Sequence, residues 1–417
     1  MTRAEAPEPS RLEDSLPLRV LDIEIGEGIP ELDLPEEYGG AHILLRRRGR
    51  PLAWVTLLAR GRRIVPERIL AALAGSGGAG AHLVLHALEP ENEERFHPSI
   101  SVVVCTRDRP DLLARCLRSM ASLEYATWEV IVVDNAPTSG ATRVEADAAG
   151  VRYVCETFPG LDRARNRGLA EARHDIVAFT DDDVEVDPRW LTGIARGFAD
   201  PQVSAVTGMI APAALDTEAQ FLFELRYSGM GKGAAPRRWD PAILPAARVV
   251  AAHSIGVGAN MAFRRQALER LGGFDTALDV GMPARGAGDL DMFHRLLAAG
   301  DVIQYEPAAL VRHHHRRDRA ALEAQHRDNG RAFGVYLLKV LRRGTLPRAK
   351  TVRYALRVWL PWLIGRPARR LFAREELPGH LLRAELFGAL QAPWAYFATY
   401  RLDRRLRREA THSAVGP

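Results

Sequence analysis

The middle of the chain alternates short apolar runs with amphipathic segments. Runs at 99–106, 128–136, 151–156 and 175–181 have the length of buried strands. Between them, Leu113, Cys116, Leu117 and Met120 recur at helical spacing within residues 110–120, and residues 161–173 form a polar helical segment. This alternation predicts an α/β fold with a largely parallel sheet covered by helices.

Polar residues stand where these apolar runs end. Asp134 and Asn135 end the second run, and Asp181, Asp182 and Asp183 follow the run at 176–180. Open α/β sheets bind ligands at the carboxyl ends of their parallel strands. Adjacent carboxylates repel one another unless a cation or a ligand compensates them. A divalent metal that holds a diphosphate would do so, because hard cations take oxygen ligands and bridge to phosphates.

Other readings of the three aspartates are a solvated loop and a calcium loop. A calcium loop needs a turn glycine and a late glutamate, where this chain has Val186 and Thr192. No GxGxxG follows the first run and no GxxxxGK[ST] occurs, which argues against a dinucleotide-binding fold and a P-loop NTPase.

The flanking regions differ from the middle in pattern. Residues 1–15 are polar and predict a disordered tail. Residues 16–95 predict a small α+β domain, with strands near 16–25, 41–47, 51–60 and 81–88, a helix from Pro66 and a flexible break at 75–80. We find no catalytic or ligand-binding motif in this domain, and we interpret it as a docking or stabilising module. Residues 321–417 predict a helical, basic region.

Charge is distributed unevenly along the 417 residues. The net charge is +5, but from Arg342 onward 16 Lys/Arg stand against 5 Asp/Glu, which leaves −6 for the remainder. Basic helices with aromatic residues, among them Trp359 and Trp362, are typical of interfacial membrane contacts. The alternative is a helical cap with solvated arginines. No nucleic-acid-binding signature accompanies the basic charge, so a nucleic-acid partner is not expected.

The location is predicted from cysteines and apolar segments. No N-terminal signal peptide and no uninterrupted membrane-spanning run is evident. Cys105, Cys116 and Cys155 are odd in number and lie in apolar contexts, so they are expected to be reduced core residues. A cytoplasmic protein is expected, with a peripheral position on the inner face of the plasma membrane as the alternative.

Six motifs in order carry a resemblance to a known family. They are CTRDRP, VIVVDN, ARNRGLA, FTDDDVEVDPRWL, GVGANMAFRRQALERLGGFD and GAGDLDMFHRL. Over residues 98–320 the chain resembles a family 2 glycosyltransferase of the GT-A fold. The resemblance implies a Rossmann-like mixed sheet for residues 96–320 that binds a nucleotide-diphosphate sugar.

The resemblance implies a donor site and a metal site. Mg²⁺ or Mn²⁺ would be held by Asp181 and Asp183, and histidines after the last strand, His313 and His315, would reach the metal or diphosphate. Solvated or core-edge histidines are the alternative, as a surface ion pair is for Arg165. The donor-binding residues implied are Thr106, Arg107, Asp108, Asp134, Arg165, Asn166, Asp181 and Asp182.

The resemblance also implies a catalytic base, Asp289, which would take the proton of the acceptor hydroxyl. The family often has a glutamate immediately before this aspartate, where this chain has Gly288. A helix N-cap is the alternative role for Asp289. Asp291 is the second candidate for the base, and Arg295 one turn later would pair with it. The implied acceptor-side residues are Gly258, Asn260, Asp275 and Asp291.

The expected function is an inverting, metal-dependent transfer of a sugar to a hydroxyl of a saccharide, a glycolipid or a lipid-linked acceptor. The main alternative is a carbohydrate- or lipid-binding scaffold without activity. A sugar-phosphate nucleotidyltransferase would need a glycine-rich basic loop where CTRDRP stands. A metal hydrolase built on the histidines and aspartates would release free sugar or phosphate without an acceptor.

Overall fold

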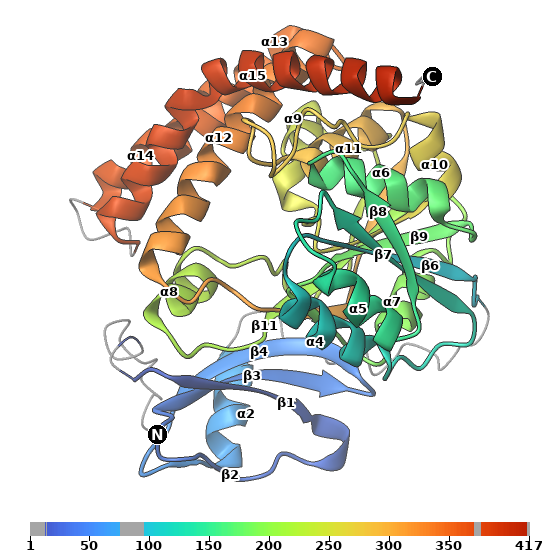
Figure 1. The fold of residues 1–417 in the computed structure, drawn as a ribbon. Helices are drawn as coiled ribbons and strands as arrows, with labels where there is room; N and C mark the ends of the chain where they lie inside the picture. Colours follow the sequence, from blue (N-terminus) through green and yellow to red (C-terminus); the bar gives the residue numbers. More distant parts are fainter. Residues whose placement is uncertain (1–12, 14, 76–95, 371–376, 415–417) are drawn as a thin grey trace.

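The computed structural model describes residues 13, 15–75, 96–370 and 377–414 (Figure 1). Most of the predicted tail, the predicted break and the predicted strand at 81–88 lie outside these residues. The N-terminal sheet lies at one end of the molecule, the C-terminal helices lie at the other, and the central α/β unit lies between them (Figure 1).

A nine-stranded mixed sheet forms the central unit, and its order is β10-β14-β11-β13-β9-β6-β7-β8, with β12 paired to β14. The four strands from β9 to β8 are parallel, whereas β13 runs antiparallel to both of its neighbours. The strands are β6 (Ile100–Thr106), β7 (Trp128–Asn135), β8 (Arg152–Glu156), β9 (Ile176–Asp181), β10 (Val184–Val186), β11 (Val203–Pro212), β12 (Arg237–Trp239), β13 (Asn260–Arg264) and β14 (Val302–His313).

Both faces of this sheet are covered, which is why four successive residues of β6, Val102 to Cys105, are apolar and buried. Val103 and Cys105 belong to one core, whereas Val102 and Val104 belong to the core on the other face. The α/β class predicted from the alternation of runs is therefore confirmed. The helices of this unit are α4 (Pro110–Met120), α5 (Ala141–Ala148), α6 (Leu161–Glu171), α7 (Trp190–Gly197), α8 (Glu218–Phe221), η2 (Leu222–Arg226), α9 (Ala246–Val250), η3 (Ala252–Ser254), α10 (Arg265–Arg270) and α11 (Gly288–Ala298).

Two local predictions are corrected by the structure. Pro188 follows the three aspartates at a position that predicts the start of a helix, but it lies in a turn, in which the backbone N–H of Trp190 donates to the carbonyl of Asp187, and α7 begins only at Trp190. Cys155 is exposed rather than in the core, because β8 lies at the edge of the sheet. Cys105 and Cys116 are buried as predicted, and all three thiols are free.

The N-terminal region forms its own sheet, in the order β1-β3-β4, and its own apolar core. The predicted hairpin is present as the antiparallel pair β3–β4. Arg46 ties the module to the central unit through Asp187 at 2.7 Å, and Arg312 returns the contact to Asp22 at 2.6 Å. The elements are β1 (Leu18–Glu24), η1 (Ile25–Glu27), β2 (Leu32–Asp33), β3 (Gly40–Arg47), β4 (Arg50–Leu58), β5 (Arg63–Ile64) and α2 (Pro66–Gly75).

The C-terminal region is helical, as predicted. The long helices α12 (Arg319–Arg343) and α15 (Gly379–Ala414) pack along each other and span one side of the central unit (Figure 1). Among the described helices, none is both long enough and apolar enough to cross a lipid bilayer. The remaining helices of this region are α13 (Arg348–Tyr354), η4 (Ala355–Trp359) and α14 (Leu360–Arg370).

Candidate active site

The register of the parallel strands brings the polar strand ends to one edge of the sheet. Thr106 at the end of β6 lies beside Asp134 of β7, and Cys105 lies beside Asp181 of β9. The last residue of β14, His313, reaches the same edge, where its Nε2 lies 3.3 Å from Oδ1 of Asp183. The sheet therefore gathers polar groups that lie up to about two hundred residues apart in the sequence.

The three consecutive aspartates have different surroundings because Asp181 ends β9, whereas Asp182 and Asp183 form the turn to β10. The side chain of Asp182 is fully buried, where it accepts a hydrogen bond from the hydroxyl of Thr106 at 2.7 Å and pairs with Arg109 at 2.7 Å. Burial raises the pKa of Asp182 to about 7. Thr106 and Asp182, both predicted to bind the donor, are thus bonded to each other.

Asp181 and Asp183 differ in the charged groups around them. Burial raises the pKa of Asp181, and the nearby Arg165 opposes that shift. Burial acts in the same direction on Asp183, but His313 and Arg109 lower the pKa of Asp183 far below its usual range. Asp183 therefore stays ionised, and its carboxylate is buried between His313 and Arg109.

Arg165 of α6 connects this edge to the start of α11. Its guanidinium is buried, pairs with Asp162 at 3.0 Å, lies 3.9 Å from Asp181 and covers the ring of Phe274 at 5.5 Å. The negative charges of Asp162, Asp181 and Asp289 all raise the pKa of Arg165 against the opposite effect of burial. The alternative of a surface ion pair is wrong for this residue, because it is buried.

Asp289 lies in the first turn of α11 and is only partly buried. Its two carboxylate oxygens accept from the backbone N–H groups of Gly258 and Leu290, each at 2.8 Å. Ala287, rather than Asp289, occupies the N-cap position, so the N-cap alternative is wrong. These two bonds fix the direction of a carboxylate that remains accessible.

Gly288 is required by close packing. A Cβ at this position would clash with the carboxylate of Asp162, so there is no room for the glutamate that the resemblance expects. Asp162 is itself buried, its Oδ2 has no hydrogen-bond partner, and burial raises its pKa well above the usual range. A carboxyl group from α6 thus occupies the space beside the start of α11.

On the donor side, Asp134 is buried at the end of β7. Its Oδ2 accepts from the hydroxyl of Tyr153 at 3.0 Å, whereas its Oδ1 has no hydrogen-bond partner. Burial raises the pKa of Asp134. Asp108 has a left-handed backbone (φ 52°) and accepts from the N–H and hydroxyl of Thr138, and Arg107 beside it is exposed.

Two residues that were predicted to contact ligands form hydrogen bonds within the protein. Asn260 accepts from the indole N–H of Trp190 at 2.9 Å and donates to the carbonyls of Met209 and Ala309, deep in the core. Asn166 bonds through both ends of its amide to the backbone of Phe274. Asn260 has both of its amide N–H groups occupied, which leaves it no donor for a ligand, whereas Asn166 keeps one N–H beyond its bond to the turn.

Asp275 and Asp291 meet in a second buried cluster, around the ammonium group of Lys339. Lys339 lies 2.5 Å from Asp275 and 2.6 Å from Asp291, and the predicted pair between Asp291 and Arg295 is present at 2.7 Å. The cluster ties α11 and the loop at 275 to α12. It leaves Asp291 without the accessibility that a base requires.

Replacing Lys339 with methionine is expected to destabilise the protein by about 3–5 kcal/mol, because two carboxylates would stay buried without their cation. Thermal or urea unfolding measures the loss. Lys350→Met is the matched control, since Lys350 is exposed, and it should change stability little. Equal effects of the two substitutions would contradict a structural role for the cluster.

The two predicted histidines differ in the acidic residue that each of them contacts. Only His313 contacts Asp183, whereas Nε2 of His315 lies 2.9 Å from Glu224 of η2. The two rings face each other, with their Nδ1 atoms 3.0 Å apart. His313 is therefore the histidine placed at the aspartate edge, and both are buried rather than solvated.

Sequence reasoning missed several residues of this site. Arg109 pairs with Asp182 and Asp183, and it could have been found in the CTRDRP motif. Asp279 accepts the backbone N–H of Asp162, which no local pattern indicates. Lys232 is partly buried, and burial lowers its pKa while the charge of Asp289 opposes that shift.

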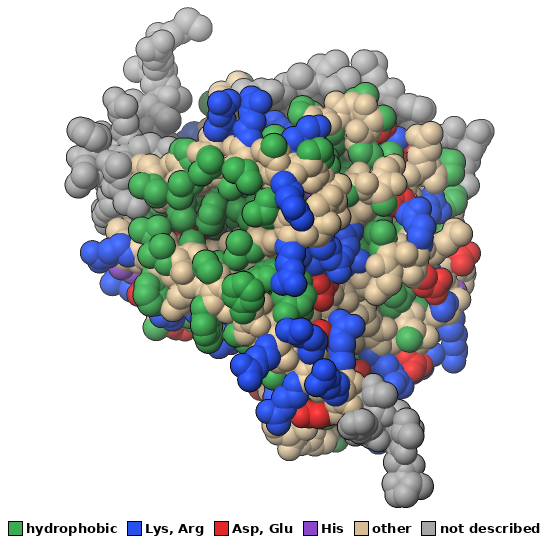
Figure 2. Space-filling view, turned by 90° about the horizontal axis from the view of Figure 1, so that it is seen from above, with side chains coloured by type: hydrophobic (Ala, Val, Ile, Leu, Met, Phe, Trp, Pro, Cys, Tyr) green, Lys and Arg blue, Asp and Glu red, His purple; other side chains and the backbone are tan. Residues whose placement is uncertain are grey.

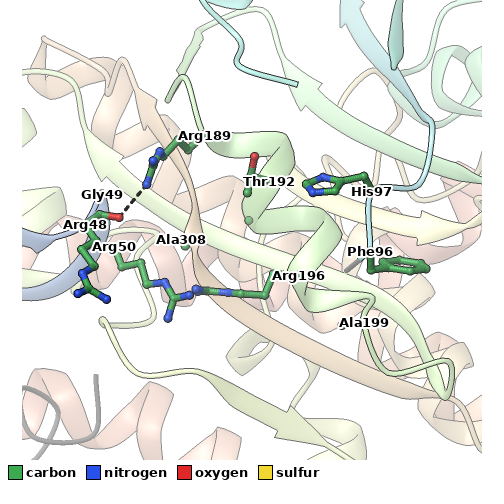
Figure 3. A pocket seen from close by; sticks show the side chains of 11 residues that line it. Arg48, Gly49, Arg50, Phe96, His97, Arg189, Thr192, Arg196, Ala199 and Ala308 are labelled. Carbon is green, nitrogen blue, oxygen red and sulfur yellow. Dashed lines mark hydrogen bonds between the residues drawn. The ribbon is translucent and has the colours of Figure 1, made fainter. Parts of the chain in front are cut away.

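A hollow lies elsewhere, between the β3–β4 turn and α7 (Figure 3). Its arginines have structural partners: Arg189 donates to the carbonyl of Arg48, as Figure 3 shows, and Arg196 pairs with Glu306. None of the residues that line it belongs to the site described above. It marks the junction with the N-terminal module.

Comparisons of the sequence with known proteins agree with this geometry. The sequence model of glycosyl transferase family 2 matches residues 101–272. A succinoglycan biosynthesis protein of Rhizobium meliloti is 30% identical over 231 residues, which cover 54% of this chain and 69% of that protein. A pre-mycofactocin glycosyltransferase of Mycobacterium tuberculosis is 32% identical over 226 residues, which cover 53% of this chain but only 43% of the relative.

A solved structure is similar in fold. The mannosyltransferase of Pyrobaculum calidifontis, determined with GDP-Man and Mn²⁺, superposes with a TM-score of 0.51 and 22% sequence identity. The match covers 79% of this chain and 99% of that one. The predicted GT-A architecture of the central sheet is thereby confirmed.

Proposed function

Because the chain belongs to glycosyl transferase family 2, we propose that it transfers a sugar from a nucleotide-diphosphate donor to a hydroxyl group of an acceptor. One observation carries the proposal. The buried Arg165 lies between the aspartate edge and Asp289, and the charges of both act on it. A guanidinium in this position suits a diphosphate, because its fork can bind two oxygens at once.

The nucleoside is proposed to bind along the ends of β6 and β7. The unpartnered Oδ1 of Asp134 could accept a base N–H or a ribose hydroxyl. Asp108 and Arg107 lie beside it at the surface. Thr106 and Asp182 are proposed to support this edge from beneath, since they already bond to each other.

The site fits a divalent cation such as Mg²⁺ or Mn²⁺. Asp183 offers a buried, ionised carboxylate, and the carboxylate of Asp181 belongs to the same strand end, two residues earlier. Mg²⁺ is usually held by one or two carboxylates together with substrate phosphates, so two carboxylates suffice. A bound cation would neutralise the charge that develops on the leaving diphosphate. His313 would orient the carboxylate of Asp183 through its contact with Oδ1.

Asp289 is proposed as the general base of a single displacement. Its carboxylate, held by two backbone N–H groups, would take the acceptor's hydroxyl proton as that oxygen attacks the anomeric carbon. The bond to the diphosphate would break on the opposite face, which inverts the anomeric configuration. Gly258 serves as one of the residues that position the base.

The acceptor is proposed to be a saccharide, a glycolipid or a lipid-linked sugar. The name of the Rhizobium relative refers to succinoglycan biosynthesis, which agrees with a role in polysaccharide or glycolipid biosynthesis. A cytoplasmic location stays a prediction.

Thermal unfolding with UDP, GDP and dTDP, each with and without Mn²⁺, tests the donor site. One nucleotide is expected to raise the melting temperature, and Mn²⁺ is expected to increase that rise, because a ligand that binds only the folded state stabilises it. The base of the preferred nucleotide names the donor class. No stabilisation by any of them would favour the scaffold alternative, and sugar release without an acceptor would favour a hydrolase.

A further inference from the structure

Helix α15 presents an apolar stripe to solvent. Its side chains are 53% (Phe387), 70% (Leu390), 64% (Trp394) and 68% (Phe397) exposed. The spacing of three and four residues places them on one face of the helix. Large apolar side chains in a continuous exposed row are unusual in a soluble protein and mark an interaction surface.

The opposite face of α15 is packed against helix α12. It packs against α12 so closely that a Cβ at Gly388 would clash with the backbone of Arg327, and Ala392 and Ala395 are buried there. The middle of α15 is therefore apolar on both sides. A helix of this kind is normally covered on both sides, so the outer stripe lacks a counterpart among the described residues.

The neighbouring helices extend the stripe into a surface. Helix α14 packs against α15, and exposed apolar side chains continue along α13, η4 and α14. Seen from above, the molecule shows hydrophobic side chains gathered on this face, with arginines and lysines along its border (Figure 2). We call this the apolar face. Its central row is the stripe of α15, formed by Phe387, Leu390, Trp394 and Phe397.

Positive charge surrounds the apolar face. Arg383 precedes the stripe and Arg401 and Arg404 follow it, all exposed and close to the same helical spacing. The sequence holds no acidic residue from 344 to 370. The one acidic residue between 379 and 402, Glu385, is buried and paired with Arg366.

We propose that the apolar face binds the surface of an anionic lipid bilayer. The aromatic and aliphatic side chains would enter the region between headgroups and acyl chains, and the arginines would contact lipid phosphates. A second copy of the chain is a poorer occupant. Arginines flank the stripe at both of its ends, so two such faces would bring like charges together in either orientation.

The apolar face is connected to the candidate active site. Tyr400 of α15 donates to Asp275, and Asp403 accepts from Thr276 and Arg163. The helix that would lie on the bilayer thus holds the loop at 275–277 and contacts α6. Bilayer binding would keep the site next to lipid-linked acceptors, although the binding itself does not depend on the proposed function.

Vesicle flotation of the full chain tests the proposal. The probes are vesicles of phosphatidylcholine alone and of phosphatidylcholine mixed with phosphatidylglycerol. The wild-type protein is expected to float with the anionic vesicles, to float less with the neutral ones, and to be released by salt, because screening weakens its electrostatic attraction. A folded wild-type protein that floats with neither kind would overturn the proposal.

Two variants locate the surface. Leu390→Ser combined with Trp394→Ser and Phe397→Ser is expected to lower vesicle partitioning at least ~10-fold, since most of the inserted apolar area is lost. Arg383→Glu combined with Arg401→Glu is expected to abolish the preference for anionic vesicles. Circular dichroism checks that both remain folded.

The matched control is Val144→Ser combined with Ile243→Ser, which removes exposed apolar side chains from elsewhere and should leave flotation unchanged. Unchanged flotation of the triple-serine variant would overturn the proposal. Sedimentation separates the remaining case: a wild-type dimer that the triple-serine variant dissociates, with no vesicle binding, would assign the face to self-association instead.

Discussion

Replacing Asp289 with asparagine is expected to lower kcat for sugar transfer by about 10²–10⁴-fold, the usual contribution of a general base. An amide has nearly the same shape as the carboxylate and keeps an oxygen for the N–H of Gly258, but it cannot take a proton from the acceptor. Initial rates at saturating donor and acceptor measure the loss.

Nucleotide binding provides the control for this substitution. The amide of Asp289→Asn can accept from only one of the two backbone N–H groups, so the melting temperature should fall slightly, whereas the nucleotide-dependent stabilisation should match that of the wild-type protein. Transfer close to the wild-type rate would show that another group is the base. Loss of nucleotide binding together with transfer would place Asp289 in the donor site instead.

Replacing Asp183 with asparagine is expected to remove the Mn²⁺-dependent part of nucleotide stabilisation and to lower kcat on the order of 10²–10³-fold. The substitution removes the negative charge of the ionised carboxylate at this edge. Thermal shifts with and without Mn²⁺ and a titration of activity with Mn²⁺ measure both effects.

Glu185→Gln is the matched control for Asp183→Asn. Glu185 lies two residues further along and pairs with His314 at 2.5 Å, on β10 and away from Asp183. Its neutralisation should leave the Mn²⁺ effect intact. Equal Mn²⁺ stabilisation of the wild-type protein and Asp183→Asn would exclude Asp183 as a metal ligand.

The sequence by itself determined the class of fold and the edge at which the site lies. Local pattern was sufficient because a strand covered on both faces, such as β6, has a continuous apolar run, and because parallel strands place their carboxyl ends together. Asp134 and Asp181 could therefore be assigned to one edge of the sheet before their contacts were known.

Only the tertiary structure decided where individual side chains point. Asn260, Asp275 and Asp291 were expected near the acceptor, yet their partners come from Trp190, Tyr400 and Lys339, elements far away in the sequence. A motif states which residue types recur, whereas the use of each polar atom depends on donors and acceptors brought in by other elements.

The same distinction applies to Gly288 and to the C-terminal helices. The sequence showed that a glutamate was missing, but only packing revealed that the carboxylate of Asp162 fills its place. The sequence does not distinguish the buried apolar residues of α15 from the exposed ones. Only the packing of α15 against α12 shows which face is buried. Periodicity predicts that a helix has apolar faces, and its neighbours determine which of them remains exposed.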